Sequence, residues 1–176
     1  MLRKLERQDA LELHPYLVDP LVFPYVRYKA ECKEEYAFLM KQVKEKEDNG
    51  ELILRVILNE SGKSIGQIAL FDIQEKSGFL GTWLGVPYHG KGYNQSAKET
   101  FFSEVFYQLD MEKVYMKIRK VNEKSRRAAL RLPYVELANH THPHIYHQVN
   151  GKEEIYDIFV VRKEVYECIM PTSMEA

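Results

Sequence analysis

The feature that most constrains this sequence is a glycine-containing loop between a predicted strand and a predicted helix. Three glycines and one proline fall within residues 85–94, a density that excludes a regular element. Residues 79–84 before it read as a strand, and residues 95–109 after it repeat apolar side chains at helical spacing. Such a loop lets the unpaired N–H groups of the first helical turn converge on a pyrophosphate. The alternative is an ordinary turn whose glycines serve geometry alone.

The rest of the chain alternates between strand and helix patterns within one domain, residues 1–176. With 45% hydrophobic residues, a chain of this length can bury a core without a second domain. Asn122 is predicted to cap a helix that Pro133 ends. We expect strands at 2–6, 52–58, 65–71, 79–84, 113–119, around 135 and at 155–161, and helices at 31–47, 95–109 and 122–132.

Charge and composition argue against several classes of function. The net charge of −1 gives no general attraction to nucleic acid, and no apolar run reaches the roughly 18 residues of a membrane helix. The first residues lack the apolar segment of a signal peptide, and Cys32 and Cys168 form no metal or disulfide pattern. We therefore expect a cytoplasmic protein without nucleic-acid or membrane partners, and leave open whether it forms a homodimer.

Two phosphate-binding patterns fit the loop only in part. Gly85–Lys91 matches G-x-x-x-x-G-K, but the next residue is Gly92 instead of the Ser or Thr that would bind magnesium. A dinucleotide-binding loop would need a third glycine at position 95, which is Gln. Both a nucleoside triphosphatase and a dinucleotide-binding protein are therefore disfavoured.

The loop resembles instead the coenzyme A loop of the GNAT acetyltransferases, whose signature is Gln or Arg, two residues, Gly, one residue, then Gly or Ala. It aligns with residues 89–94, where His89 replaces Gln or Arg and Asn94 replaces the small residue. Further motifs in the same order resemble the branch of ribosomal-protein N-terminal acetyltransferases: Asp19-Pro20, Ile65-Gly66, Thr82-Trp83-Leu84, Gly90-Lys91-Gly92-Tyr93, Asn122 with Ser125, Pro133-Tyr134 and Asp157.

This resemblance implies an α/β, GNAT-like fold with a mixed, mostly antiparallel central sheet flanked by helices, in which two strands splay apart to admit acetyl-CoA. It implies direct attack of an amine on the thioester in a ternary complex, with no metal. Main-chain N–H groups of residues 84–86 would bind the pantetheine arm and the carbonyl oxygen, and those of 90–94 the pyrophosphate. The predicted coenzyme-binding residues are Leu84, Gly85, Val86, His89, Gly90, Lys91, Gly92, Tyr93, Asn94, Asn122 and Ser125.

The acid and base are less clearly marked. Ser125 or Tyr134 could protonate the leaving thiolate, and Asp72, Glu75 or water could accept the proton of the amine. Ala129 stands where many relatives have a Tyr acid, so a coenzyme-binding module without catalysis is the alternative hypothesis. A nucleotide-binding protein that uses the loop is a third.

The acceptor could be a protein N-terminus, a polyamine, an amino acid or an antibiotic. We expect its pocket to come from residues 11–30 and from the loop around 140–151, because loops set specificity.

Two clusters of ionisable residues have more than one interpretation. Residues 112–131 carry eight basic residues against two acidic ones. These could bind the 3′-phosphate of the coenzyme, or an acidic or RNA-bearing substrate, or could only face solvent. His140, His142 and His144 would share one face of a strand and could bind a metal, but Pro143 interrupts that strand. With His147 nearby, we favour a polar hairpin beside the acceptor pocket.

Overall fold

Seven strands build the central sheet of the computed structural model, which describes residues 1–172. They are β1 (Leu2–Arg3), β2 (Ile53–Leu58), β3 (Ser64–Gln74), β4 (Ser77–Leu84), β5 (Lys113–Arg119), β6 (Val135–Leu137) and β7 (Tyr156–Arg162). The strand order is β1-β2-β3-β4-β5-β7-β6, and every neighbouring pair is antiparallel except β4 and β5. The predicted α/β fold with a mixed, mostly antiparallel sheet is confirmed.

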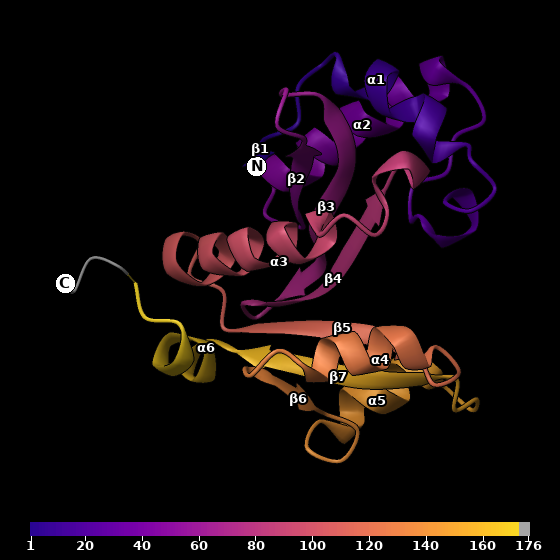
Figure 1. The fold of residues 1–176 in the computed structure, drawn as a ribbon. Helices are drawn as coiled ribbons and strands as arrows, with labels where there is room; N and C mark the ends of the chain where they lie inside the picture. Colours follow the sequence, from indigo (N-terminus) through magenta and orange to yellow (C-terminus); the bar gives the residue numbers. More distant parts are fainter. Residues whose placement is uncertain (173–176) are drawn as a thin grey trace.

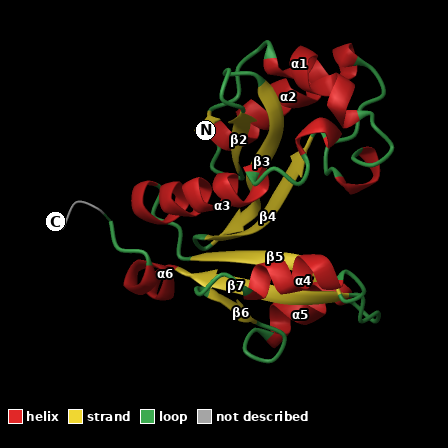
Figure 2. Cartoon of the chain, viewed as in Figure 1, coloured by secondary structure: helices red, strands yellow, loops and turns green. Residues whose placement is uncertain are grey.

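Helices cover both faces of this sheet (Figures 1 and 2). They are α1 (Asp9–Leu17), α2 (Lys33–Asp48), α3 (Tyr93–Ser103), α4 (Glu123–Leu130), α5 (Pro143–Asn150) and α6 (Lys163–Ile169). A π-helical segment, Glu104–Gln108, continues α3, and short 3₁₀ turns lie at Phe23–Tyr25 and Val86–Tyr88. No helix within residues 1–172 is both long and apolar enough to span a membrane.

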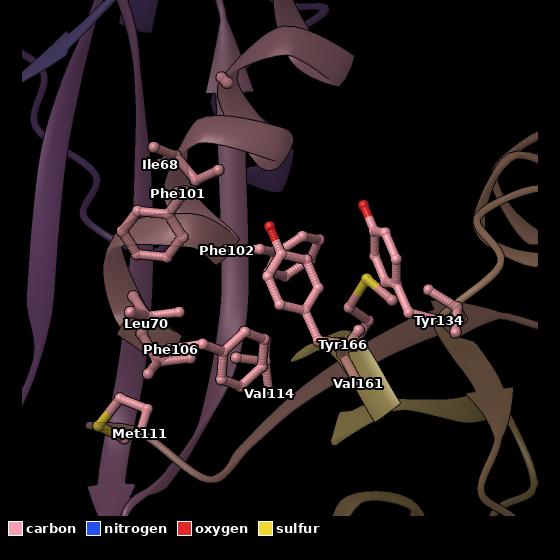
Figure 3. Packing of buried hydrophobic residues seen from close by; sticks show 14 of the residues in the cluster. Ile68, Leu70, Phe101, Phe102, Phe106, Met111, Val114, Tyr134, Val161 and Tyr166 are labelled. Carbon is pink, nitrogen blue, oxygen red and sulfur yellow. The ribbon is translucent and has the colours of Figure 1, made fainter. Parts of the chain in front are cut away.

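The alternation of side chains along each strand divides the core between the two faces. In β5, Val114 and Met116 join the cluster under α3, whereas Tyr115 packs with α5 on the opposite face. Because successive residues of a strand point to opposite sides, the apolar pattern read from the sequence sorts the helices into two layers. The cluster under α3 is rich in aromatic rings, among them Phe101, Phe102, Phe106, Tyr134 and Tyr166 (Figure 3).

The parallel pair at the centre of the sheet is short. β4 and β5 are paired only at Ser77–Lys113, Gly78–Val114 and Phe79–Tyr115. Beyond Phe79 the two strands diverge, and the N-terminus of α3 and the helix α4 lie at the open end (Figure 1). The resemblance predicted such a divergence, and it determines where the chain can admit a ligand.

Three local predictions differ from the structure. Residues 143–150 form the helix α5 instead of a polar hairpin, because Ile145, Tyr146 and Val149 pack on the sheet. The predicted strand at 2–6 has only two residues, and the helix predicted at 95–109 begins at Tyr93 and becomes π-helical from Glu104. The short helix α6, at the end of β7, was not predicted.

Candidate active site

A cavity of about 640 Å³ opens where β4 and β5 diverge. This volume lies within the range of small-molecule sites, roughly 300–1,000 Å³. Residues from β4, the glycine loop, α3, α4 and the N-terminal segment before α2 line it: Leu21, Val22, Tyr25, Thr82, Trp83, Leu84, Tyr88, His89, Gly90, Gly92, Tyr93, Asn94, Gln95, Lys98, Glu99, Lys124, Ala128, Arg131, Leu132 and Tyr134.

The glycine loop leaves the N-terminus of α3 uncapped. Gly92 adopts φ +84°, a left-handed conformation, and precedes the first helical residue, Tyr93. No side chain caps this end, so the N–H groups of its first turn lack an intrahelical or side-chain acceptor. A Cβ at Gly92 would meet no atom within 4 Å, which shows that the backbone angle, not crowding, requires glycine there. The helix end is thus open to an anion.

The end of β4 directs one main-chain N–H toward the divergence. The Gly85 N–H donates to the Ile65 carbonyl of β3 at 2.8 Å. Because successive N–H groups along a strand point to opposite edges, the N–H of Leu84 faces away from β3, toward β5. The His89 ring contacts the same residue, with its Nε2 2.8 Å from the Leu84 carbonyl oxygen. Since a carbonyl oxygen only accepts, Nε2 carries a hydrogen.

The charges that line the cavity come from α3, from α4 and from Arg131 directly after α4. Lys98, Lys124 and Arg131 are cationic, and Glu99 is the one carboxylate among the lining residues. Lys98 is half-buried, and burial lowers the pKa of its ammonium below the ordinary 10.5. Within residues 1–172 this ammonium has no hydrogen-bond or ion-pair partner, so a partly desolvated positive charge faces the cavity without a counter-ion.

Tyr134 is the predicted catalytic residue that reaches the cavity. Its ring packs against Phe102 and Tyr166, with centroids 5.7 and 5.0 Å away. Figure 3 shows its hydroxyl group pointing away from the centre of this cluster. Burial raises the pKa of Tyr134 to about 12, so the phenol is protonated at neutral pH.

The other predicted site residues lie elsewhere. The Asn122 side chain accepts a hydrogen bond from the Ser125 N–H at 3.2 Å, which confirms the predicted helix cap, and neither residue lines the cavity. Asp72 lies at a second cavity, where its carboxylate is 2.7 Å from Arg27. Of the predicted coenzyme-binding residues, Leu84, His89, Gly90, Gly92, Tyr93 and Asn94 line the cavity, and Gly85, Val86, Lys91, Asn122 and Ser125 do not.

Gly85 has a packing reason for being glycine. A Cβ at this position would come within 2.8 Å of the Tyr16 ring, which α1 places against the loop. The Tyr16 hydroxyl is 3.2 Å from that of Tyr88, a residue of the cavity wall. This glycine therefore holds α1 close to the site instead of making room for a ligand.

The basic stretch and the histidines separate into different environments. Lys124 and Arg131 reach the cavity. Five other basic residues contact side chains elsewhere in the same chain: Lys113, Lys117, Lys120, Arg126 and Arg127. Lys113 Nζ donates to His142 Nε2 at 3.3 Å, and none of the residues 140–151 lines the cavity, contrary to our expectation for the acceptor pocket. In the described part of the chain, no three His, Cys, Asp or Glu side chains could together hold a metal ion.

Sequence reasoning missed Lys98 and the cavity role of Arg131. A signal for Lys98 existed: it stands four residues before Phe102 and eight before Phe106, on a stripe that is otherwise buried. The cavity residues Leu21 and Tyr25 fall in the predicted acceptor segment, 11–30, but nothing in the sequence distinguished them from their neighbours.

Comparisons with known proteins agree with this geometry. Residues 1–134 match the model of the acetyltransferase (GNAT) domain family. A spermidine N-acetyltransferase of Vibrio cholerae has a similar fold, with a TM-score of 0.71 and 17% identity over 94% of this chain and 96% of that one. The ribosomal-protein-S5-alanine acetyltransferase of Vibrio fischeri gives a TM-score of 0.72 and 18% identity over 93% and 92%.

No curated protein sequence matches the chain significantly. The family match nevertheless covers most of the length and includes β4, the glycine loop, α3 and α4. From this match, the chain belongs to the GNAT acetyltransferase family.

Proposed function

We propose that this protein transfers the acetyl group of acetyl-CoA to a primary amine. The observation that carries the proposal is the uncapped N-terminus of α3, which opens into the same cavity as an unpaired, half-buried Lys98. Lys124 and Arg131 line this side of the cavity as well. Converging N–H groups and excess positive charge suit the pyrophosphate and the 3′-phosphate of the coenzyme.

The residues present fit an acyl-CoA in a second respect. The arm of such a ligand is extended and carries amide groups, and the unpaired edges of β4 and β5 beyond Phe79 offer main-chain donors and acceptors. The Leu84 N–H lies on this edge. It would donate to the thioester oxygen as negative charge develops there, which is the role predicted for residues 84–86.

The proposed transfer needs no group beyond the two substrates. The nitrogen lone pair of the neutral amine attacks the thioester carbon, the C–S bond breaks, and the sulfur leaves with the bonding electrons. The nitrogen loses a proton and the thiolate gains one, so the products are an amide and a free thiol. Holding both substrates in one cavity supplies the proximity that such a reaction requires.

Tyr134 is the residue best located to assist the leaving group. A phenol with a pKa of about 12 is a much weaker acid than an ordinary thiol, whose pKa is about 8.5. Complete proton transfer from Tyr134 to the thiolate would therefore be unfavourable, and we assign it a hydrogen-bond donor role. Ser125, the other predicted donor, lies outside the cavity. Asp72 and Glu75, the predicted bases, also lie outside it, so water is the proposed acceptor of the amine's proton.

The proposal extends to the acceptor, the assembly and the location of the protein. A protein N-terminus and a small-molecule amine are both proposed acceptors, in line with the names of the ribosomal-protein and spermidine acetyltransferases of similar fold. Another structure of the spermidine enzyme is dodecameric, with a TM-score of 0.72 and 16% identity over 94% of this chain and 95% of that one. Homodimer assembly and a cytoplasmic location stay predictions for this chain.

Thermal unfolding with acetyl-CoA or Mg-ATP tests the coenzyme assignment. A ligand that binds only the folded state at about 100 times its Kd adds about 2.7 kcal/mol, or roughly 5–11 °C in Tm for a domain of this size. We expect this shift with acetyl-CoA and none with Mg-ATP. The opposite result would favour the nucleotide-binding hypothesis.

Thiol release with a panel of amines then tests catalysis. Release above the rate of spontaneous hydrolysis, together with acetylated amine in the mass spectrum, supports the enzyme. Binding of acetyl-CoA without transfer to any amine would favour the coenzyme-binding module, the alternative to which Ala129 points.

A further inference from the structure

One end of the cavity is lined by charged side chains and the other by uncharged ones. The ionic side chains of the cavity are Lys98 and Glu99 of α3, Lys124 of α4, and Arg131, which directly follows α4. The end formed by β4 and the N-terminal segment is lined by uncharged side chains: Leu21, Val22, Tyr25, Thr82, Trp83 and Leu84. Since the phosphates of the coenzyme require the cationic end, the uncharged end is left for the acceptor.

Two large, mainly apolar side chains at this uncharged end are exposed. Leu21 is 67% exposed and Tyr25 is 80% exposed. Single exposed apolar residues are common on protein surfaces and need no partner. These two, however, lie on the wall of one cavity, one turn apart around the 3₁₀ turn Phe23–Tyr25, where an entering molecule would cover both.

Within residues 1–172, no carboxylate that could bind a polycation lines this end of the cavity. Asp19 is the acidic residue nearest in sequence, and its Oδ1 already accepts the N–H of Leu21 at 2.9 Å within its own turn. Asp72, further away, is paired with Arg27. A second ammonium of a polyamine would therefore find no carboxylate among the described residues that line this end.

Resting on the proposed function, we propose that the acceptor is a primary amine on an apolar, aromatic or branched aliphatic body, with no second cationic centre. The body would lie against Leu21 and Tyr25, and the nitrogen would point along β4 toward Leu84. This separates the chain from the spermidine enzymes of similar fold. A small amine and a peptide with an apolar first residue share this chemistry.

Three acceptors distinguish these sources: 2-phenylethylamine, a short uncharged peptide that begins with Phe, and spermidine. We expect kcat/KM for the better of the first two to exceed that for spermidine by at least about tenfold, the effect of burying one large apolar group. Which of the two is better identifies the source. An equal or higher value for spermidine overturns the inference while leaving acetyl transfer established.

Substitutions locate the effect in the cavity wall. Leu21→Ala and Tyr25→Ala should each raise KM for the apolar amine by about tenfold and leave KM for acetyl-CoA unchanged. Leu11→Ala on α1 and Phe38→Ala on α2 are matched controls, because these residues are 53% and 62% exposed and do not line the cavity. Equal effects of wall and control variants would contradict the assignment.

A binding measurement separates this inference from the proposed function. Trp83 is the single tryptophan of the chain and lines the acceptor end. With coenzyme A present, titration with 2-phenylethylamine should change its fluorescence, and the change should weaken in Tyr25→Ala. If acetyl-CoA neither raises Tm nor loses its thioester with any amine, the proposed function and this inference fall together.

Discussion

Lys98 on α3 is followed at four-residue steps by two buried aromatic rings, Phe102 and Phe106. The half-buried ammonium has no partner within residues 1–172, and its pKa is lowered by desolvation. Desolvation of the ammonium destabilises the unliganded protein, and only pairing with a bound anion would offset this cost. This cost to the unliganded fold is what we expect of a binding residue, not of a structural one.

Lys98→Met separates these two effects. The methionine should stabilise the unliganded protein by about 1 kcal/mol, because the desolvated charge is removed. It should also weaken acetyl-CoA binding by about 10–100-fold, the usual value of a charge-assisted hydrogen bond. Urea unfolding and calorimetric titration measure the two. Lys98→Arg, which keeps the charge, serves as the control, and a loss of stability together with unchanged affinity would refute the assignment.

The same residue should affect the alkaline pH dependence of stability. The pKa of Lys98 in the folded protein is below its ordinary 10.5, so the unfolded chain binds more protons between these two values. The free energy of unfolding of the wild type, relative to Lys98→Met, should therefore rise with pH in that range and stay constant below it. Urea unfolding of both proteins at a series of alkaline pH values measures the difference.

Among the elements, α1 is anchored to the sheet by its first residue. The buried Asp9 carboxylate accepts hydrogen bonds from two Arg3 nitrogens, the Glu6 N–H and the Ser64 hydroxyl, all at 2.7 Å. Burial alone would raise the pKa of Asp9, but these donors outweigh it and the pKa is lowered below 3.8. The anchor joins α1 to β1 and β3 and so supports the Tyr16 contact with the loop.

The lowered pKa determines how acid should act on this anchor. Stability from Asp9 is fully present above pH 3.8 and is lost as pH falls through the lower folded-state pKa. Asp9→Asn should reduce the free energy of unfolding at pH 7 by about 2–3 kcal/mol and flatten its decline below pH 4. Urea unfolding at several pH values measures both effects. An unchanged acid limb in the variant would show that other carboxylates control it.

The sequence allowed some elements to be predicted far better than others. The strand at 113–119 was predicted to the residue, because its strict alternation reflects a sheet with a different layer on each face. In contrast, Pro143 was read as a strand breaker, although it occupies the first turn of α5, a position where proline is favoured. The histidines around it obscured the apolar spacing of Ile145 and Val149.

The candidate site was predictable where the backbone determines it. Gly90 and Gly92 of the loop adopt left-handed conformations, so the open helix end proposed to bind an anion could be read locally. Which wall residues face the cavity could not, because this depends on how the N-terminal segment and α4 pack across the diverging strands. Asn122 shows the limit: its motif was recognised, yet its side chain caps α4 and does not line the cavity.

At the scale of the whole molecule, the sheet consists of a four-stranded part, β1 to β4, and a three-stranded part, β5 to β7, joined by three residue pairs. Acetyl-CoA in the divergence would contact both parts. We expect it to slow hydrogen exchange at residues 80–84 of β4 and to leave the β6–β7 pair unchanged, which mass spectrometry of peptic fragments would measure. Uniform protection of both regions would indicate general stabilisation instead.

The divergence also gives this protein a sheet edge in its interior. Exposed edges recruit extended chains from other molecules, with aggregation as the risk, whereas this one lies between α3 and α4 (Figure 1). A bound arm that carries amides can act there as a temporary eighth strand. Coenzyme A would then leave only after its hydrogen bonds to this edge have broken. We therefore expect its release, and not acetyl transfer, to limit turnover.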